Sequence, residues 1–509
     1  MAKRKRQVVA PNEPIAEPVL KKKAKGSKVL KEKPVTSKAK PAATKEKPTT
    51  TTTATTSAAV SETIQIVVGS YDRVLHGLTV TIGPKEKTEF ADTFLFNAHT
   101  SAIRCVAVSP ISAPVPGQTQ KVMLASGSTD ERINVYNLSA HPPSRKNQEM
   151  LAKVAPRPIL ENPKNREVGA LLHHSSTVTA LRFPTRSKLL SSSEDSTIAV
   201  TRTRDWSLLS NIKAPIAQPL GRPSGDTAPF GGTPSGVNDF AIHPSMKLMI
   251  SVSKGERSMR LWNLVTGKKA GVLNFGKDML QEAGEGKHST GEGRRVVWGS
   301  AGGDDEFAVG FDRDIVVFGM DSVPKCRVMG GIRTKVHQFF YVTVDEEADV
   351  KVLAVATEDG RVLFFSTNED DLTKAGGDGE EKTSSSLPTA KLLGQIGGKA
   401  GGVDGRIKDI VIVQSATDAS TLYVAGGSSD GRIRLWRVTS DEVQGKTNNG
   451  DKAGEVALGK LLGTYETQNR ITCMTAFMMI PRPEGVEDSE DEMDDEDEDA
   501  DSGSDSDED

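Results

Sequence analysis

Residues 124–138 read LASGSTDERINVYNL, which is a run of small residues, a turn ending in an acid and then an alternating apolar strand. Runs of this form recur along the middle of the chain. Internal repeats of this length decide a fold before any single motif does. The other copies read VVGSYDRVLHGLTV (67–80), LSSSEDSTIAVTR (190–202), ISVSKGERSMRLWNL (250–264), FAVGFDRDIVVFG (307–319), LAVATEDGRVLFF (353–365) and VAGGSSDGRIRLWRV (424–438).

Each copy has the pattern of an antiparallel hairpin, because branched or aromatic residues alternate on both sides of a turn containing Gly, Ser or Asp. A further strand precedes several copies, and none of these segments has a helical period. Three or four short strands in each of seven units predict an all-β fold, a seven-bladed β-propeller, whose radial closure leaves only short edges. The preceding strands are 102–110, 177–185, 236–244 and 294–300.

Successive turn acids stand 47 to 71 residues apart, more than the roughly 40–45 residues of a compact blade. The excess lies in segments rich in Pro, Gly or charge, which predict loops on the rims of the propeller. The turn acids are Asp72, Asp130, Asp195, Glu256, Asp312, Asp359 and Asp430. The insertions are 139–168, 213–236, 274–293, 369–403 and 439–460.

Ring closure is also predictable from the order of the strands. The C-terminal run RITCMTAFMMI (470–480) has the pattern of an inner strand with no hairpin after it, and the first copy (64–80) has no convincing strand before it. We therefore expect the two segments to share one blade. Residues 470–480 should then be essential for folding.

The repeat resembles that of the WD-repeat family over roughly residues 62–480. In that family a histidine before the first strand, a Ser or Thr in the second, an acid at the turn and a Trp in the third form one hydrogen-bonded set. The resemblance implies structural roles for the residues at these places. They are His99, Ser126, Asp130 and Tyr136 in the second copy, His174 and Asp195 in the third, Glu256 and Trp262 in the fourth, Asp312 in the fifth, Asp359 in the sixth, and Asp430 and Trp436 in the seventh.

The net charge of −3 is the sum of a strongly basic N-terminal segment, a strongly acidic C-terminal segment and a nearly neutral middle. Residues 1–60 hold 15 Lys/Arg and 4 Asp/Glu, whereas residues 484–509 hold 17 Asp/Glu and no Lys/Arg. Both ends are poor in aromatic and branched apolar residues, so we expect them to be disordered. The predicted organisation is a basic tail (1–60), a propeller with long insertions (61–480) and an acidic tail (481–509).

Two signals lie in these tails. The basic clusters fit a nuclear address or an RNA-binding arm, although a tail that only aids solubility would have the same composition. They consist of Lys3, Arg4, Lys5, Arg6, Lys21, Lys22, Lys23 and Lys25. In the acidic tail, four serines stand three residues before an acid and suit an acidophilic kinase; alternatively, the unmodified tail attracts basic partners such as ribosomal proteins or histones. These serines are Ser489, Ser502, Ser504 and Ser506.

The sequence offers no convincing catalytic or cofactor site. Cys105, Cys326 and Cys473 form no C-x-x-C pair, and the adjacent His173 and His174 have no acid at metal-ligand spacing. The segment GEGKHST (284–290) lacks the first glycine of a phosphate loop and has histidine in the place of its final Ser or Thr. Without a signal peptide or a long apolar run, we expect a non-enzymatic protein with no cofactor, small-molecule substrate or membrane span.

A narrower resemblance is to the PAK-interacting WD-repeat proteins and their fungal maintenance-of-killer counterparts. AHTSAIRCVAV (98–108), LLHHSSTVTALRF (171–183), IHPSMKLMISV (242–252) and LWNLVTGK (261–268) carry it. It implies a nucleolar scaffold that binds pre-60S ribosomal particle proteins, and rRNA through the basic tail. The alternatives are an adaptor restraining a PAK-type kinase and a histone-binding chromatin protein. Basic residues in the loops are candidate contacts or a solvated rim: Lys254, Arg257, Arg260, Arg294 and Arg295.

Overall fold

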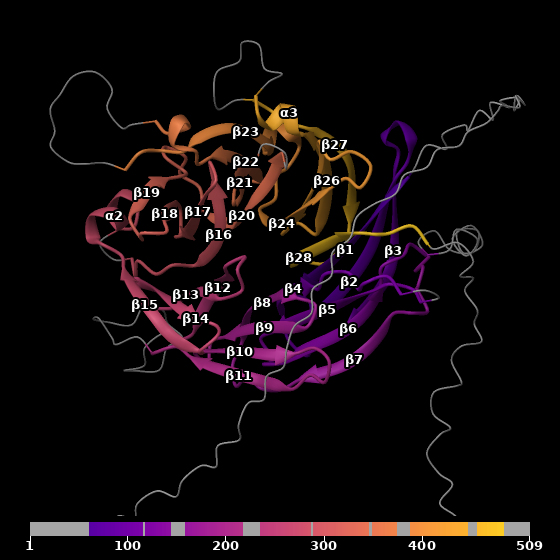
Figure 1. Cartoon of the computed structure of the whole chain (residues 1–509). Helices are drawn as coiled ribbons and strands as arrows, with labels where there is room; N and C mark the ends of the chain where they lie inside the picture. The colour runs from indigo at the N-terminus through magenta and orange to yellow at the C-terminus, as the bar shows by residue number, and fades with distance from the viewer. Residues whose placement is uncertain are drawn as a thin grey trace, which may run out of the picture. The chain divides into compact units, whose positions relative to one another are not determined.

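The computed structural model contains seven four-stranded antiparallel sheets arranged around one axis (Figure 1). It describes residues 61–115, 118–143, 158–216, 235–286, 289–345, 349–373, 387–445 and 456–482. Within these ranges the predicted all-β, seven-bladed propeller is confirmed, and every blade has four strands. Among the described residues, no helix is long and apolar enough to cross a membrane.

Each blade runs from an inner strand next to the axis to an outer strand at the periphery (Figure 1). In this order, blade 1 consists of β28 (Ile471–Met478), β1 (Glu62–Ser70), β2 (Val74–Ile82) and β3 (Thr88–Asn97). Blades 2 to 4 are β4 (Ile103–Val108), β5 (Lys121–Ser128), β6 (Ile133–Ser139), β7 (Arg166–Leu171); β8 (Val178–Thr185), β9 (Lys188–Ser193), β10 (Thr197–Arg202), β11 (Leu208–Lys213); and β12 (Val237–Ile242), β13 (Leu248–Ser253), β14 (Ser258–Asn263), β15 (Lys268–Asn274). Blades 5 to 7 are β16 (Arg295–Ala301), β17 (Asp304–Gly310), β18 (Ile315–Gly319), β19 (Pro324–Arg327); β20 (Val336–Asp345), β21 (Val350–Thr357), β22 (Arg361–Ser366), β23 (Lys391–Gly397); and β24 (Ile407–Gln414), β25 (Thr421–Ser428), β26 (Arg432–Thr439), β27 (Lys460–Glu466).

The apolar cores lie between neighbouring blades. One cluster joins Val67 and Leu75 of blade 1 to Ile103 and Leu124 of blade 2. Because both faces of the second strand are covered, β5 and β25 are buried along almost their whole length. The small residues of the repeat permit this close packing: a Cβ added at Gly127 would lie 2.7 Å from Val178 Cγ1 of the next blade.

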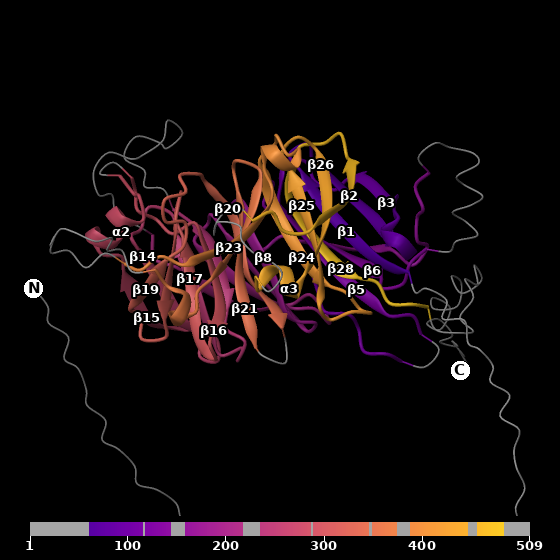
Figure 2. The same ribbon diagram turned by 90° about the horizontal axis from the view of Figure 1, so that it is seen from above.

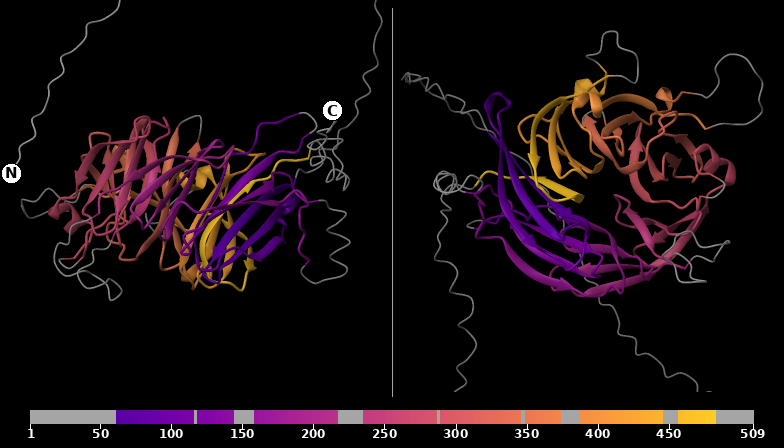
Figure 3. Two further views of the ribbon diagram at one scale, coloured as in Figure 1. Left: turned by 90° about the horizontal axis from the view of Figure 1, so that it is seen from below. Right: turned by 180° about the vertical axis from the view of Figure 1, so that it is seen from behind.

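The two ends of the propeller meet in blade 1. Strand β28 pairs with β1 from Ile64 opposite Met478 to Ser70 opposite Ile471, and the Met479 N–H donates to the Thr63 carbonyl oxygen at 2.8 Å. Figures 2 and 3 show the yellow β28 beside the indigo β1 from different directions. The predicted closure of the ring by residues 470–480 and 64–80 is therefore confirmed.

The predicted insertions are not loops throughout. Segment 274–293 contains α2 (Lys277–Glu282), because Met279 and Leu280 are buried in the core between blades 4 and 5. Segment 369–403 contains the outer strand β23, and segment 439–460 begins with α3 (Ser440–Val443). Short 3-10 helices complete the elements: η1 (Pro84–Glu86), η2 (Glu369–Asp371) and η3 (Lys399–Gly401). Apolar residues hidden among Gly and charged residues explain these differences.

Candidate binding surface at the turn face of the propeller

One end of every blade carries the turn between its second and third strands. In blade 2 the last residue of the second strand, Ser128, lies opposite Ile103 at the start of the inner strand. The turn that contains Asp130 follows Ser128 directly. Because the strands are antiparallel, the turn acids and the starts of the inner strands lie at the same end of each blade. We call this end the turn face.

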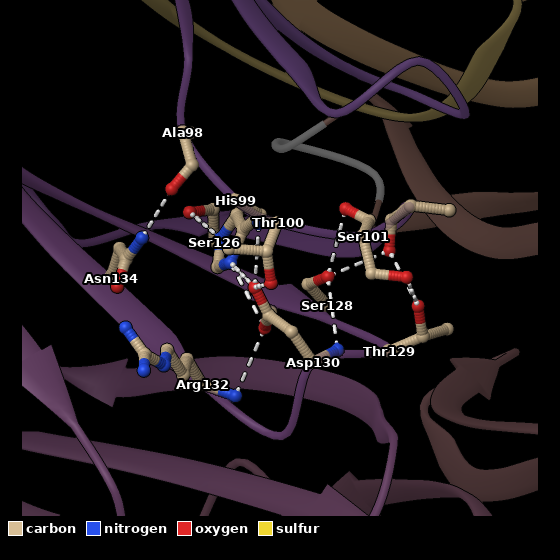
Figure 4. Close-up of polar contacts among 12 residues, drawn as sticks. Ala98, His99, Thr100, Ser101, Ser126, Ser128, Thr129, Asp130, Arg132 and Asn134 are labelled. Carbon is tan, nitrogen blue, oxygen red and sulfur yellow. Dashed lines mark hydrogen bonds and ion pairs between the residues drawn. The ribbon is translucent and has the colours of Figure 1, made fainter.

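In blade 2 the predicted set His99, Ser126 and Asp130 is brought together (Figure 4). His99 Nε2 lies 2.8 Å from Ser126 Oγ, and His99 Nδ1 lies 3.1 Å from Asp130 Oδ2. The N–H groups of Thr100 and Arg132 donate to the Asp130 carboxylate at 3.0 and 3.1 Å. Burial lowers the pKa of His99, so the ring is neutral at physiological pH and joins the strands by hydrogen bonds.

The carboxylate of Asp130 remains charged in this set. Burial alone would raise the pKa of Asp130, but hydrogen bonds from Thr100 and Arg132 and the contact with His99 outweigh burial and lower it. Blade 3 has the same arrangement: His174 Nε2 lies 2.8 Å from Ser191 Oγ, and Nδ1 lies 3.1 Å from Asp195 Oδ2. The two histidines and two aspartates thus tie the turn to the segment that leads into each inner strand.

Arginines pair with the turn acid in four blades that lack the leading histidine, blades 4 to 7. Arg260 donates to Glu256 through two nitrogens, and Arg434 Nη2 donates to Asp430 Oδ2 at 3.3 Å. Both arginines follow the acid by four residues and are almost fully buried. In blade 6 Asp359 accepts from Arg361, two residues later. The acid is retained while its cationic or imidazole partner changes.

The remaining predicted positions have varied surroundings. Asp312 Oδ1 lies 3.1 Å from Arg294 Nη1, and Asp72 accepts from the Arg470 N–H at 3.1 Å. Trp262 Nε1 donates to Ser251 Oγ at 2.8 Å. Tyr136 packs edge-on against Phe96, with ring centroids 5.5 Å apart.

Trp436 has no hydroxyl at the equivalent place, because glycine stands there. The ring of Trp436 approaches Gly426 so closely that an added Cβ would lie 2.9 Å from the Cζ3 atom. The indole therefore contributes packing in the cluster between blades 6 and 7.

A β-bulge recurs at the start of the inner strand in six blades. In blade 2, Ile103 pairs with Ser128 and Cys105 with Gly127, so Arg104 between them has no partner. Bulges of this kind redirect a side chain from the sheet. Blade 5 shows no such shift, and there we take Arg295, which pairs with Gly310 and directly precedes the second paired residue, Val296. We call the seven residues at this place the axial ring: Thr472, Arg104, Thr179, Asn238, Arg295, His337 and Lys408.

Three members of the axial ring fasten one blade to the next. Thr472 Oγ1 donates to the Ile103 carbonyl at 2.7 Å, and Thr179 Oγ1 donates to the Val237 carbonyl at 2.7 Å. Asn238 Nδ2 donates to the Gly293 carbonyl at 2.9 Å. The small polar members of the ring are therefore occupied by the backbone of the following blade.

The other four members are basic or imidazole side chains. Lys408 Nζ lies 3.4 Å from His337 Nε2 on the neighbouring blade. Burial, followed by the positive charge of Lys408, lowers the pKa of His337 to about 4, so this imidazole is neutral and accepts the hydrogen bond. Burial and the nearby charge of Arg406 also lower the pKa of Lys408.

Few carboxylates balance these charges. Among the described residues, Arg104 and Lys408 have no Asp or Glu within ion-pair distance, and Arg295 lies 3.9 Å from Asp239. Asp239 is also 3.5 Å from Arg182. Asp409 accepts from the Met474 N–H at 2.8 Å, and burial raises the pKa of Asp409 to about 6.

A shallow pocket of about 330 Å³ lies on the same face, between the first turn and the segment before β4. Tyr71, Asp72, Arg73, Thr100, Ser101 and Ala102 line it. Tyr71 is 60% exposed, and the Arg470 guanidinium carbon lies 5.6 Å from its ring centroid. The N–H of Thr100, which lines the pocket, donates to Asp130.

Nothing in the described ranges assembles a metal or nucleophile site. No group of three or more His, Cys, Asp or Glu there could hold a metal ion. Burial raises the pKa of the Cys105 and Cys326 thiols to about 12 and that of Cys473 further still, so these thiols are poor nucleophiles. The arrangement can bind and position other groups.

Several predicted residues lie outside the described ranges: the basic clusters of the N-terminal tail and the four serines of the acidic tail. Of the basic residues considered as loop contacts, Lys254 pairs with Glu194 at 2.6 Å. Arg257 donates to the carbonyl oxygens of Thr290 and Ser289. Local contacts thus occupy both side chains.

Sequence reasoning did not single out Arg104, His337 and Lys408. Arg104 follows the first apolar residue of a strand that was recognised, and aligning the repeats on that residue would have found it. His337 and Lys408 lie on β20 and β24, strands that the repeat pattern did not identify. Their proximity depends on two blades meeting at the axis.

Comparison with known proteins extends the geometric picture. A family model described as "WD domain, G-beta repeat" matches residues 165–200, which span β7 to β10. The chain is 24% identical over 433 residues to the Xenopus laevis p21-activated protein kinase-interacting protein 1-like, covering 85% of each chain. It is 27% identical over 441 residues to Saccharomyces cerevisiae Protein MAK11, covering 81% of this chain and 87% of that one. Shk1 kinase-binding protein 15 of Schizosaccharomyces pombe is 24% identical over 210 residues, 41% of this chain and 46% of its own.

Proposed function

Because the chain is a seven-bladed WD-repeat β-propeller similar over most of its length to MAK11 and to p21-activated kinase-interacting proteins, we propose that it is a nucleolar scaffold for large ribosomal subunit assembly. In this role it binds proteins of the pre-60S particle through the rims of the propeller. The basic tail supplies the nuclear address and a contact with rRNA. The activity is binding, without a chemical step.

The observation that carries the proposal is the likeness to MAK11 over 81% of this chain. A likeness of this extent is more specific than the match of a WD repeat to residues 165–200. The opposed charges of the two ends support the same role, since 15 Lys/Arg in residues 1–60 favour a phosphate backbone. The 17 Asp/Glu of residues 484–509 favour basic proteins.

The test is fractionation of a nuclear extract that contains the tagged chain. Co-sedimentation with large-subunit precursor RNA and assembly proteins, together with a defect in large-subunit rRNA processing on depletion, is the expected result. A tagged chain ending at residue 469 serves as a control, because it lacks β28 and cannot close the ring. Sedimentation as free protein and normal rRNA processing after depletion would overturn the proposal.

A second candidate function rests on the names of several relatives, which describe them as interacting with p21-activated kinases or as binding the Shk1 kinase. In this role the propeller is an adaptor that restrains a PAK-type kinase. Purified chain should then bind such a kinase and reduce its autophosphorylation. Absence of both effects would exclude this function. Histone binding through the acidic tail is the third alternative, and loss of histone pull-down on deletion of residues 484–509 is its test.

A further inference from the structure

The axial ring concentrates positive charge where six inner strands bulge. Arg104, Arg295 and Lys408 occupy three of its seven places, and none of the seven is acidic. Against the larger effect of burial, which raises the pKa of Cys105 in blade 2, the positive charges of Arg104 and Arg295 lower it. The charge of Arg295 also acts on the pKa of Asp409 in blade 7. Lys408 of blade 7 lies 3.4 Å from His337 of blade 6, and Arg295 of blade 5 lies 3.9 Å from Asp239 of blade 4, so the basic side chains reach neighbouring blades around the axis.

Neighbouring side chains strengthen this positive field. Besides burial, the positive charges of Arg406, Arg470 and Lys335 lower the pKa of Lys408, and the negative charge of Glu358 raises it. Glu358 itself lies 3.3 Å from Arg406. Lys335 likewise lies 3.8 Å from Asp312, so Lys408 and Arg470 are the cations of this group without an ion-pair carboxylate among the described residues.

We propose that the axial ring is a binding site for an acidic peptide segment, whose carboxylate side chains contact Arg104, Arg295 and Lys408. A carboxylate at this place would form charge-assisted hydrogen bonds with Arg104 and Lys408, which have no carboxylate partner among the described residues, and would share Arg295 with Asp239, which lies 3.9 Å away. Arg295 and Lys408 are already partly buried, so removal of the remaining water around them strengthens the attraction, whereas Arg104 is exposed. The inference goes beyond the assembly role and does not depend on it.

The surroundings of the ring favour a narrow peptide over an RNA strand. Each blade places one turn acid further from the axis, from Asp72 in blade 1 to Asp430 in blade 7. An RNA backbone crossing the face would pass these carboxylates, whereas an acidic side chain entering along the axis would meet the basic ring, where Asp239 lies beside Arg295. Single-stranded RNA also binds by stacking on exposed aromatic rings. Of the exposed aromatic residues at this end of blade 1, Tyr71 has the Arg470 guanidinium 5.6 Å from its ring centroid, and Phe96 packs against Tyr136.

The inference can be tested with the full chain and a labelled peptide of sequence 484–509, which carries 17 acids. Fluorescence anisotropy would compare the wild-type chain with Lys408→Glu and Arg104→Glu. The matched control is Lys269→Glu, since Lys269 is exposed on the outer strand β15 and has no ion-pair partner in the described ranges. Thermal melting would verify that all variants remain folded. We expect each ring variant to lose at least tenfold in affinity and the control to retain it.

A second measurement separates the ring from the basic N-terminal tail, which also attracts an acidic peptide. The imidazole proton signals of His337, assigned with His337→Gln, should shift on addition of the peptide, and the pKa of His337 should rise from about 4. Peptide bound only to the tail would leave these signals unchanged. The inference would be overturned if both ring variants bound the peptide as tightly as the wild-type chain, or if the His337 signals did not change on addition of the peptide. It would also be overturned if the ring variants lost binding to RNA and retained binding to the peptide.

Discussion

Asp130 shows how one side chain fixes a turn. Its two carboxylate oxygens accept hydrogen bonds from the backbone of Thr100 and Arg132, which flank the turn from two directions, and they also contact His99. A charged acceptor with several donors contributes more than a neutral hydrogen bond. The Asp130 carboxylate therefore has a structural role, because all its partners belong to the same blade.

Asp130→Ala should lower the free energy of unfolding by about 2 kcal/mol, because it leaves the buried His99 and two N–H groups without their acceptor. Urea denaturation at pH 7 measures this change. Asp370→Ala is the matched control, since Asp370 is exposed and accepts no side-chain hydrogen bond from a described residue. Equal stability of the two variants would contradict a structural role for the turn acid.

His173 should make stability depend on pH. Burial and the neighbouring His174 lower the pKa of His173 to about 4, from an ordinary value of 6.5. Between these values the unfolded chain binds more protons, so stability is lost as the pH falls from 6.5 towards 4. With a discount for partial exposure, the loss between pH 7 and pH 5 is about 1 kcal/mol. His173→Gln should remove this part of the loss. Urea denaturation at pH 7 and pH 5 measures the free energy of unfolding of both proteins. A variant that loses as much stability between the two pH values as the wild-type chain would contradict the role of His173.

Residue spacing allowed the structural set to be predicted where the repeat is complete. His99, Ser126 and Asp130 stand at family places, and the structure brings them within hydrogen-bond distance. The pairing of Arg260 with Glu256 was not predictable in the same way, because an arginine four residues after an acid has many possible partners. The proximity of Lys408 and His337 depends on blade geometry and leaves no trace in the local sequence.

At the scale of elements, strand patterns were readable where apolar residues alternate in short runs. Outer strands such as β7 and β15 were not foreseen, because one face is exposed and polar residues interrupt the alternation. Helix α2 was hidden because Gly and Glu surround its few buried residues. Ring closure was readable because β28 has an inner-strand pattern without a following hairpin.

The pairing of β28 with β1 predicts unequal effects of two truncations. A chain ending at residue 469 loses β28, exposes the edge of β1 and opens the apolar cluster between blades 1 and 2, to which β28 contributes Cys473 and Phe477. It should aggregate or lose cooperative thermal unfolding. A chain ending at residue 482 retains β28 and should melt at the temperature of the full chain. Cooperative unfolding of the shorter chain would contradict a closing role for β28.

At the scale of the whole molecule, charge is divided among three regions. The basic residues 1–60 and the acidic residues 484–509 have opposite net charges of +11 (15 − 4) and −17 (0 − 17). The propeller between them is close to neutral but carries its own basic ring at the axis. Binding of polyanions and of basic proteins should therefore be separable by deletion.

Binding to single-stranded RNA should reside in the basic tail. A chain beginning at residue 61 should lose at least tenfold in RNA affinity at about 0.1 M salt, because phosphate contacts release counterions and each contributes a slope of about −0.7 in log affinity against log salt. A chain ending at residue 482 should bind RNA more tightly than the full chain, since 17 repelling acids are absent. Lys408→Glu should leave RNA affinity unchanged. Anisotropy titrations over a range of salt concentrations distinguish these cases, and a chain from residue 61 that retained the affinity and the salt slope would place RNA on the propeller.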